Sequence, residues 1–214
     1  MSAAAGKLIQ AVEEQLATLY RFPLVTSAVP FLMKSEQFER TGEARAPRAA
    51  VFFTQTSDTL DIGIFIDPEL LDTLDAYDPK IQLSSHNLDA YCVLIEELSH
   101  FHLLLQRSEE GRGISQLELE WQGEIDKLLI AGLLMSEQRQ TSCFQNLHRL
   151  IFEEGVLISQ DPVYQEASHY AAKCWHRLLP KSQRLTDVRG HVLPILQKAY
   201  KANWDHKFRI IRDL

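Results

Sequence analysis

Residues 93 to 105 read Val93-Leu94-Ile95-Glu96-Glu97-Leu98-Ser99-His100-Phe101-His102-Leu103-Leu104-Leu105. Apolar residues recur here with the spacing of an amphipathic helix, which we expect over residues 87–106. With about 100° between successive residues, Glu96 and Glu97 lie within roughly 60° of His100 around the helix. A carboxylate in apolar surroundings is costly unless it is paired or bound to a cation. The stretch therefore predicts a polar site on one side of a buried helix.

A second helix, predicted over residues 115–137, contributes another acidic residue. Glu124 lies on the same side as its apolar stripe, which is formed by Leu117, Trp121, Ile125 and Leu128. Glu118 and Glu120 are expected to be more exposed. If the two helices pack through their apolar sides, Glu124 approaches His100.

A pair of strand-like segments precedes these helices. Residues 49–56 and 60–67 are rich in β-branched and aromatic residues and flank a short turn at Ser57-Asp58, which is typical of a β-hairpin. Four further segments have helical character: 7–20, 140–158, 162–179 and 186–202. Pro194 is expected to break or kink the last of them. The pattern predicts an α+β, mostly helical fold, in which a small β-sheet (hairpin about 49–67) packs on a helical bundle.

Composition limits the class of protein. The chain has 214 residues, which suits a single domain over 1–214. The sequence contains no run of about 18 apolar residues, so a membrane span is not expected. The first residues do not resemble a signal peptide. The three cysteines, Cys92, Cys143 and Cys174, are odd in number and far apart, which favours a reducing compartment over a disulfide framework. We therefore expect a soluble, cytoplasmic protein.

Charge is distributed unevenly along the chain. The net charge is -7, so a nucleic-acid partner is not expected. Residues 57–124 carry 15 acidic and 3 basic residues, whereas residues 181–214 carry 8 basic and 3 acidic ones. Such runs are usually solvated faces. The alternative is that the basic end docks on the acidic middle or on an acidic partner.

Residues 96–100 resemble the metal-binding helix of zincin metallopeptidases. In that family, the two histidines of H-E-x-x-H bind zinc and the glutamate is the general base. The ImmA/IrrE type combines a strand pair, an H-E-L-x-H helix and a second helix with an E-x-x-A-N motif and a trailing L-L-M. Glu96-Glu97-Leu98-Ser99-His100 resembles the first motif, Glu124-Ile125-Asp126 the second and Leu133-Leu134-Met135 the third. The resemblance implies a zincin-like core over about 49–136, with an N-terminal helix (7–20) and a C-terminal helical extension (140–214).

Carried over residue by residue, the resemblance makes Glu97 the general base and His100 and Glu124 metal ligands. Glu96 replaces the first histidine, so it would have to bind the metal through a carboxylate. Such a Glu-His-Glu site is harder and more anionic, which shifts preference from zinc towards manganese or iron, or loses the metal. The added negative charge also makes a metal-bound water less acidic, which weakens general-base chemistry.

Three functional hypotheses follow. The favoured one is a degenerate zincin-like protein without peptidase activity, which binds a protein partner or a small ligand in the former cleft. The second is a metal-dependent hydrolase, with a divalent metal (Zn, Mn or Fe) held by Glu96, His100 and Glu124. The third is a structural or adaptor helical protein, in which the acidic middle and basic end mediate self-association. A di-iron carboxylate site, which is built from Glu-x-x-His motifs on two helices, is not expected.

Overall fold

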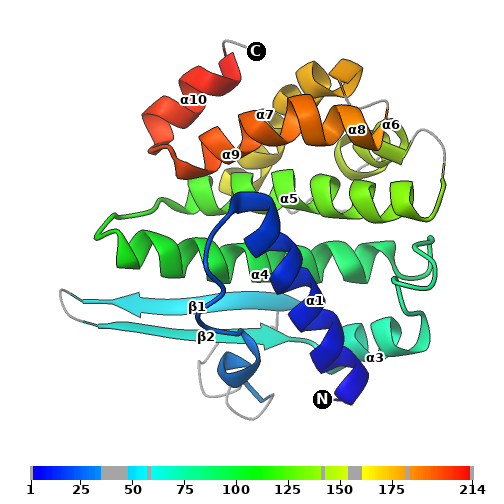
Figure 1. The fold of residues 1–214 in the computed structure, drawn as a ribbon. Helices are drawn as coiled ribbons and strands as arrows, with labels where there is room; N and C mark the ends of the chain where they lie inside the picture. Colours follow the sequence, from blue (N-terminus) through cyan, green and yellow to red (C-terminus); the bar gives the residue numbers. More distant parts are fainter. Residues whose placement is uncertain are drawn as a thin grey trace.

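The computed structural model describes residues 2–34, 48–56, 59–140, 143–153, 161–181 and 184–212. A two-stranded sheet, then α4, then α5, then the C-terminal helices are stacked as successive layers (Figure 1). Helix α1 packs across this stack against α3, α4 and α9. The prediction of an α+β, mostly helical fold with a small sheet on helices is confirmed.

The helices of the described ranges are α1 (Ala3–Tyr20), α3 (Pro68–Ala76), α4 (Leu88–Glu109), α5 (Gln116–Glu137), α6 (Cys143–His148), α7 (Pro162–Leu178), α8 (Leu185–Asp187), α9 (Leu193–Lys201) and α10 (Trp204–Arg212). Short 3-10 turns cover Val29–Phe31 and Leu179–Lys181. None of the helices in these ranges has the length and apolar character needed to cross a membrane.

The predicted hairpin is present. Strand β1 (Ala49–Gln55) pairs antiparallel with β2 (Leu60–Ile66), with Val51 opposite Ile64. The expected turn residues Ser57 and Asp58 lie outside the described residues. The backbone N–H of Met33 donates to the Ile64 carbonyl at 2.7 Å on the other side of β2. Strand β1 packs against α4, so the residues of its first half lie beside that helix.

Helices α4 and α5 run antiparallel and form the centre of the molecule (Figure 1). Both are covered on more than one side, so apolar residues around much of their circumference are buried. Fully buried examples come from both helices: Leu94, Ile95, Leu98, Ile125 and Leu128. The structure places both helices within three residues of their predicted ends.

The C-terminal helices are more broken than the sequence predicts. The segment expected as one helix from 140 forms α6 and then a wide (π) turn over Arg149–Glu153, and residues 154–158 lie outside the described part. A second wide turn, Val188–Val192, precedes α9. Pro194 stands in the first turn of α9, where its missing N–H leaves no helical bond unmade. Helical residues nevertheless run without a gap from Leu185 to Lys201, so the chain meets Pro194 with a wide turn before it and does not end the helical segment there.

Helix α10 is joined to α5 by a buried ion pair, which corrects one prediction. Lys207 Nζ lies 3.0 Å from Glu118 Oε1, and Arg107 Nη2 lies 3.2 Å from the same oxygen. Glu118 is therefore buried (3% exposed), whereas it was predicted to be more exposed. The reason is that two cations from distant helices satisfy its charge. Lys207 of the basic end thus contacts the acidic middle within one chain.

Candidate functional site

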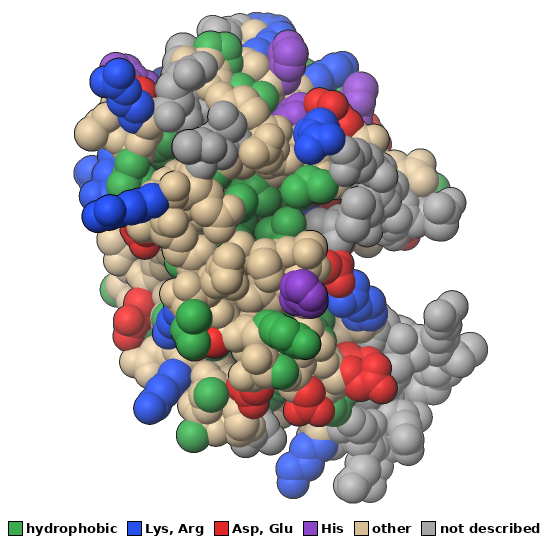
Figure 2. All heavy atoms as spheres, turned by 90° about the vertical axis from the view of Figure 1, so that its right-hand side faces the viewer, with side chains coloured by type: hydrophobic (Ala, Val, Ile, Leu, Met, Phe, Trp, Pro, Cys, Tyr) green, Lys and Arg blue, Asp and Glu red, His purple; other side chains and the backbone are tan. Residues whose placement is uncertain are grey.

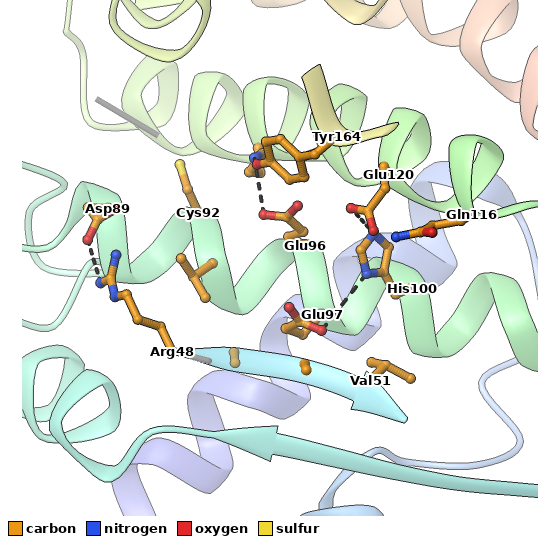
Figure 3. Close-up of a pocket in the computed structure, with 14 residues that line it drawn as sticks. Arg48, Val51, Asp89, Cys92, Glu96, Glu97, His100, Gln116, Glu120 and Tyr164 are labelled. Atoms are coloured by element: carbon orange, nitrogen blue, oxygen red, sulfur yellow. Dashed lines mark hydrogen bonds and ion pairs between the residues drawn. The ribbon is translucent and has the colours of Figure 1, made fainter. Parts of the chain in front are cut away.

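A cavity of about 630 Å³ lies between β1, α4 and α5, with Tyr164 of α7 over it (Figure 3). Its charged lining residues are Arg48, Asp89, Glu96, Glu97, Glu120 and Lys127. Four of these side chains are acidic and two are basic, and Arg48 is paired with Asp89. Among the described residues, the lining therefore carries an excess of negative charge around α4 and α5.

The three polar residues predicted on α4 all line this cavity. Glu96, Glu97 and His100 are each 7% exposed, and their side chains lie on the cavity side of the helix (Figure 3). Opposite them, α5 presents Gly123. A Cβ atom at Gly123 would lie 2.9 Å from His100 Nε2 and 3.0 Å from Glu96 Cγ. The absence of a side chain at Gly123 thus lets the imidazole approach the α5 backbone.

Glu124 is buried, as predicted, but its nearest charged partner is a lysine. Lys127 Nζ lies 2.9 Å from Glu124 Oε1 and 3.1 Å from Glu96 Oε2. The same ammonium donates a hydrogen bond to the hydroxyl oxygen of Tyr164 at 2.6 Å. It therefore lies between the two glutamates to which the zincin resemblance assigns metal-binding roles.

Lys127 is a permanent cation in this position. Burial alone lowers its pKa, but the Glu96 and Glu124 carboxylates outweigh that effect and raise the pKa well above the ordinary lysine value. Sequence analysis missed Lys127. Its position three residues after Glu124, on a helix with few exposed faces, is the signal that could have indicated it.

Glu120 also belongs to the cavity, although it was predicted to be more exposed. Its side chain is 17% exposed, and Oε2 lies 3.6 Å from His100 Nε2. Glu96, His100 and Glu120 each offer one ligand atom within 4.8 Å of the others. Burial raises the pKa of Glu120 to about 7, with repulsion from Glu96 adding to the effect. Gln116, one turn earlier on α5, lines the cavity as well, so this side of the first turns of α5 faces it.

Two buried polar atoms of the cavity lining have no hydrogen-bond partner among the described residues: Glu97 Oε2 and His100 Nε2. Glu124 Oε2, beside the lining, has none either. Glu97 Oε2 lies 3.9 Å from His100 Nδ1. Burial lowers the pKa of His100, which favours the neutral imidazole. Burial, followed by repulsion from Glu96, raises the pKa of Glu97 well above its ordinary value. Groups perturbed in this way and gathered in one cavity are typical of functional sites.

Cys92 lines the same cavity, in surroundings that disfavour a nucleophilic thiolate. Its side chain is fully buried, and burial raises the pKa of the thiol to about 12. The thiolate that a cysteine nucleophile requires is therefore absent at neutral pH.

A second, apolar cavity of about 400 Å³ adjoins the first, since Asp89 lines both. Its apolar lining residues are Leu83, Leu88, Met135, Leu150 and Ile151. Figure 2 shows hydrophobic side chains gathered in a hollow on the face where α4 begins and α5 ends.

Comparisons with protein-family models, with curated proteins and with solved structures give no match. The likeness to zincins rests on the residues and motifs quoted from the sequence.

Proposed function

We propose that this chain is a ligand-binding protein with a zincin-like core and no peptidase activity. The observation that carries the proposal is the position of Lys127 Nζ, 3.1 Å from Glu96 Oε2 and 2.9 Å from Glu124 Oε1. An ammonium there pairs with one oxygen of each carboxylate. It has no open coordination position for a water or a carbonyl oxygen, which zincin chemistry requires.

The ligand carries positive charge. Glu97 and Glu120 remain in the cavity without a basic residue of their own, and Glu97 Oε2 has no partner in the described parts of the chain. A bound cation reduces the mutual repulsion of these carboxylates. The adjoining apolar cavity would suit an apolar group on the same ligand, because the two spaces meet at Asp89.

A metal-dependent hydrolase is the second candidate. It is favoured by the two unpartnered atoms, since Glu97 Oε2 is where a general base would act and His100 Nε2 is where a metal would bind.

A hydrolysis assay separates these two functions. The full chain is incubated with unfolded casein and with a mixed pool of quenched fluorescent peptides, in the presence of Zn²⁺, Mn²⁺ or Fe²⁺. We expect no turnover above that of Glu97→Gln, because that variant lacks the carboxyl to which the zincin resemblance assigns the role of base. Metal-dependent turnover that disappears in Glu97→Gln would overturn the proposal and establish the hydrolase.

A further inference from the structure

We infer that the cavity binds a divalent cation through Glu96, His100 and Glu120. The inference rests on the proposed function, because it names the positively charged ligand of the same cavity. It differs from the ligand set that the zincin resemblance implies, since Glu120 takes the part there given to Glu124.

His100 supplies the first argument. Its side chain is 9% exposed and faces the cavity, and Nε2 has no hydrogen-bond partner among the described residues. Native proteins rarely leave a buried polar atom unsatisfied, so a missing partner at this atom points to a ligand. A neutral imidazole nitrogen is the commonest metal ligand in proteins.

The spacing of the three ligand atoms is the second argument. All of them lie within 4.8 Å of one another, and His100 Nε2 and Glu120 Oε2 are 3.6 Å apart. Bonds of about 2.0 to 2.2 Å place two ligand atoms of one ion roughly 3 to 4 Å apart. Small side-chain rotations of Glu96 and Glu120 therefore complete the set. Gly123 leaves the room that the imidazole needs beside α5.

Position in the cavity decides between Glu120 and Glu124. Glu120 lines the cavity with Glu96 and His100, and these three offer ligand atoms within 4.8 Å of one another. Glu124 is not among the lining residues, and its Oε1 accepts the Lys127 ammonium at 2.9 Å. Glu120 stands one turn earlier on α5, beside His100, and has no lysine or arginine partner in the described ranges. Glu96 contacts Lys127 through Oε2, which leaves Oε1 for the ion.

The donor set selects the class of ion. One imidazole nitrogen and two carboxylate oxygens suit Mn²⁺, Fe²⁺ or Zn²⁺ and disfavour soft ions such as Cu⁺. The neighbouring Lys127 ammonium offsets one of the carboxylate charges, which lowers the affinity below that of an uncompensated site.

Calorimetric titration of the full chain with MnCl₂ or ZnCl₂, after removal of metal with a chelator, tests the inference. We expect one ion per chain. Near-isosteric variants keep the packing: His100→Gln and Glu120→Gln should each weaken binding by at least about 10- to 100-fold, the range seen for residues that only support ligands. Glu124→Gln is the matched control and should change affinity by no more than about threefold, because the residue is not a ligand.

Two results would overturn the inference. One is that the wild-type chain binds neither ion. The other is that Glu124→Gln abolishes binding while Glu120→Gln retains it. If a variant fails to fold, the visible absorption of the Co²⁺-loaded wild-type chain still tests the inference. We expect bands characteristic of nitrogen and oxygen ligation. A parallel titration with spermidine distinguishes the two proposals: binding of spermidine alone rejects the metal but retains a cationic ligand, whereas peptide hydrolysis rejects the proposed function.

Discussion

Replacing Lys127 by alanine is expected to lower the free energy of unfolding by about 3–5 kcal/mol, the usual cost of removing one partner from a buried ion pair. The Lys127 side chain is 1% exposed and contacts two carboxylates. Without it, Glu96 and Glu124 become buried charges without a counter-ion. Urea unfolding followed by circular dichroism at pH 7 measures the loss.

Two controls show whether the loss comes from unpaired charge. Lys80→Ala removes an exposed lysine and should change stability by less than about 0.5 kcal/mol. The triple variant Glu96→Gln, Glu124→Gln, Lys127→Met removes all three charges together. It should recover most of the stability, because a buried ion cluster replaced as a whole is often neutral or stabilising. A loss below about 1 kcal/mol in Lys127→Ala would contradict the buried-cluster account.

Replacing Glu13 by alanine is the second large effect, with an expected loss of about 3 kcal/mol or more. Glu13 is fully buried on α1 and joins three parts of the chain. Its carboxylate accepts hydrogen bonds from the Ala28 backbone N–H at 2.6 Å and the Ser27 hydroxyl at 2.8 Å, and its Oε1 lies 3.0 Å from His102 Nε2. Truncation therefore leaves buried polar groups unsatisfied on the segment after α1 and on α4.

The neighbouring residue provides the matched control. Glu14 is exposed and bonds only Gln10 among the side chains of the described residues, so Glu14→Ala should stay within about 0.5 kcal/mol of the wild type. Equal effects of the two substitutions on the midpoint of chemical unfolding would show that Glu13 does not hold α1 to α4.

The fold was predictable where hydrophobic periodicity is long. The apolar spacing over 87–106 and 115–137 predicts α4 and α5, because a helix buried on several sides repeats its pattern over many turns. Helix α10 was not predicted. Its nine residues, Trp204–Arg212, include four charged ones, if histidine is left out. The helix is held by contacts with distant helices, among them the buried Lys207–Glu118 ion pair and the packing of Trp204 on Trp121. Such a contact between distant segments leaves no local pattern.

The site was predictable in part for the same reason. Helix geometry alone places Glu96, Glu97 and His100 on one side of α4, and the structure agrees. The roles of Glu120 and Lys127 depend on how α5 is rotated against α4 and on Tyr164 of α7. Local spacing specifies neither the rotation of α5 against α4 nor the position of Tyr164. The long lysine side chain can also reach partners on several sides.

Buried charge is the feature that connects these results. Glu118, Glu124 and Asp126 lie on α5. Glu118 pairs with Lys207 of α10, Asp126 accepts a hydrogen bond from Ser99 of α4, and Glu124 pairs with Lys127 of α5 itself. Glu120, on the same helix, differs from these residues. Among the described residues, the one titratable group within ion-pair distance of its carboxylate is His100. We expect the ligand to supply the positive charge that Glu120 lacks in the cavity.

A crystal structure of the chain grown with MnCl₂, with anomalous diffraction recorded at the manganese edge, tests the central claim most directly. The account predicts that Lys127 Nζ remains within hydrogen-bond distance of both Glu96 and Glu124, and that a manganese peak lies beside His100 Nε2 and Glu120. A manganese peak that bridges Glu96 and Glu124, with Lys127 turned away, would contradict it.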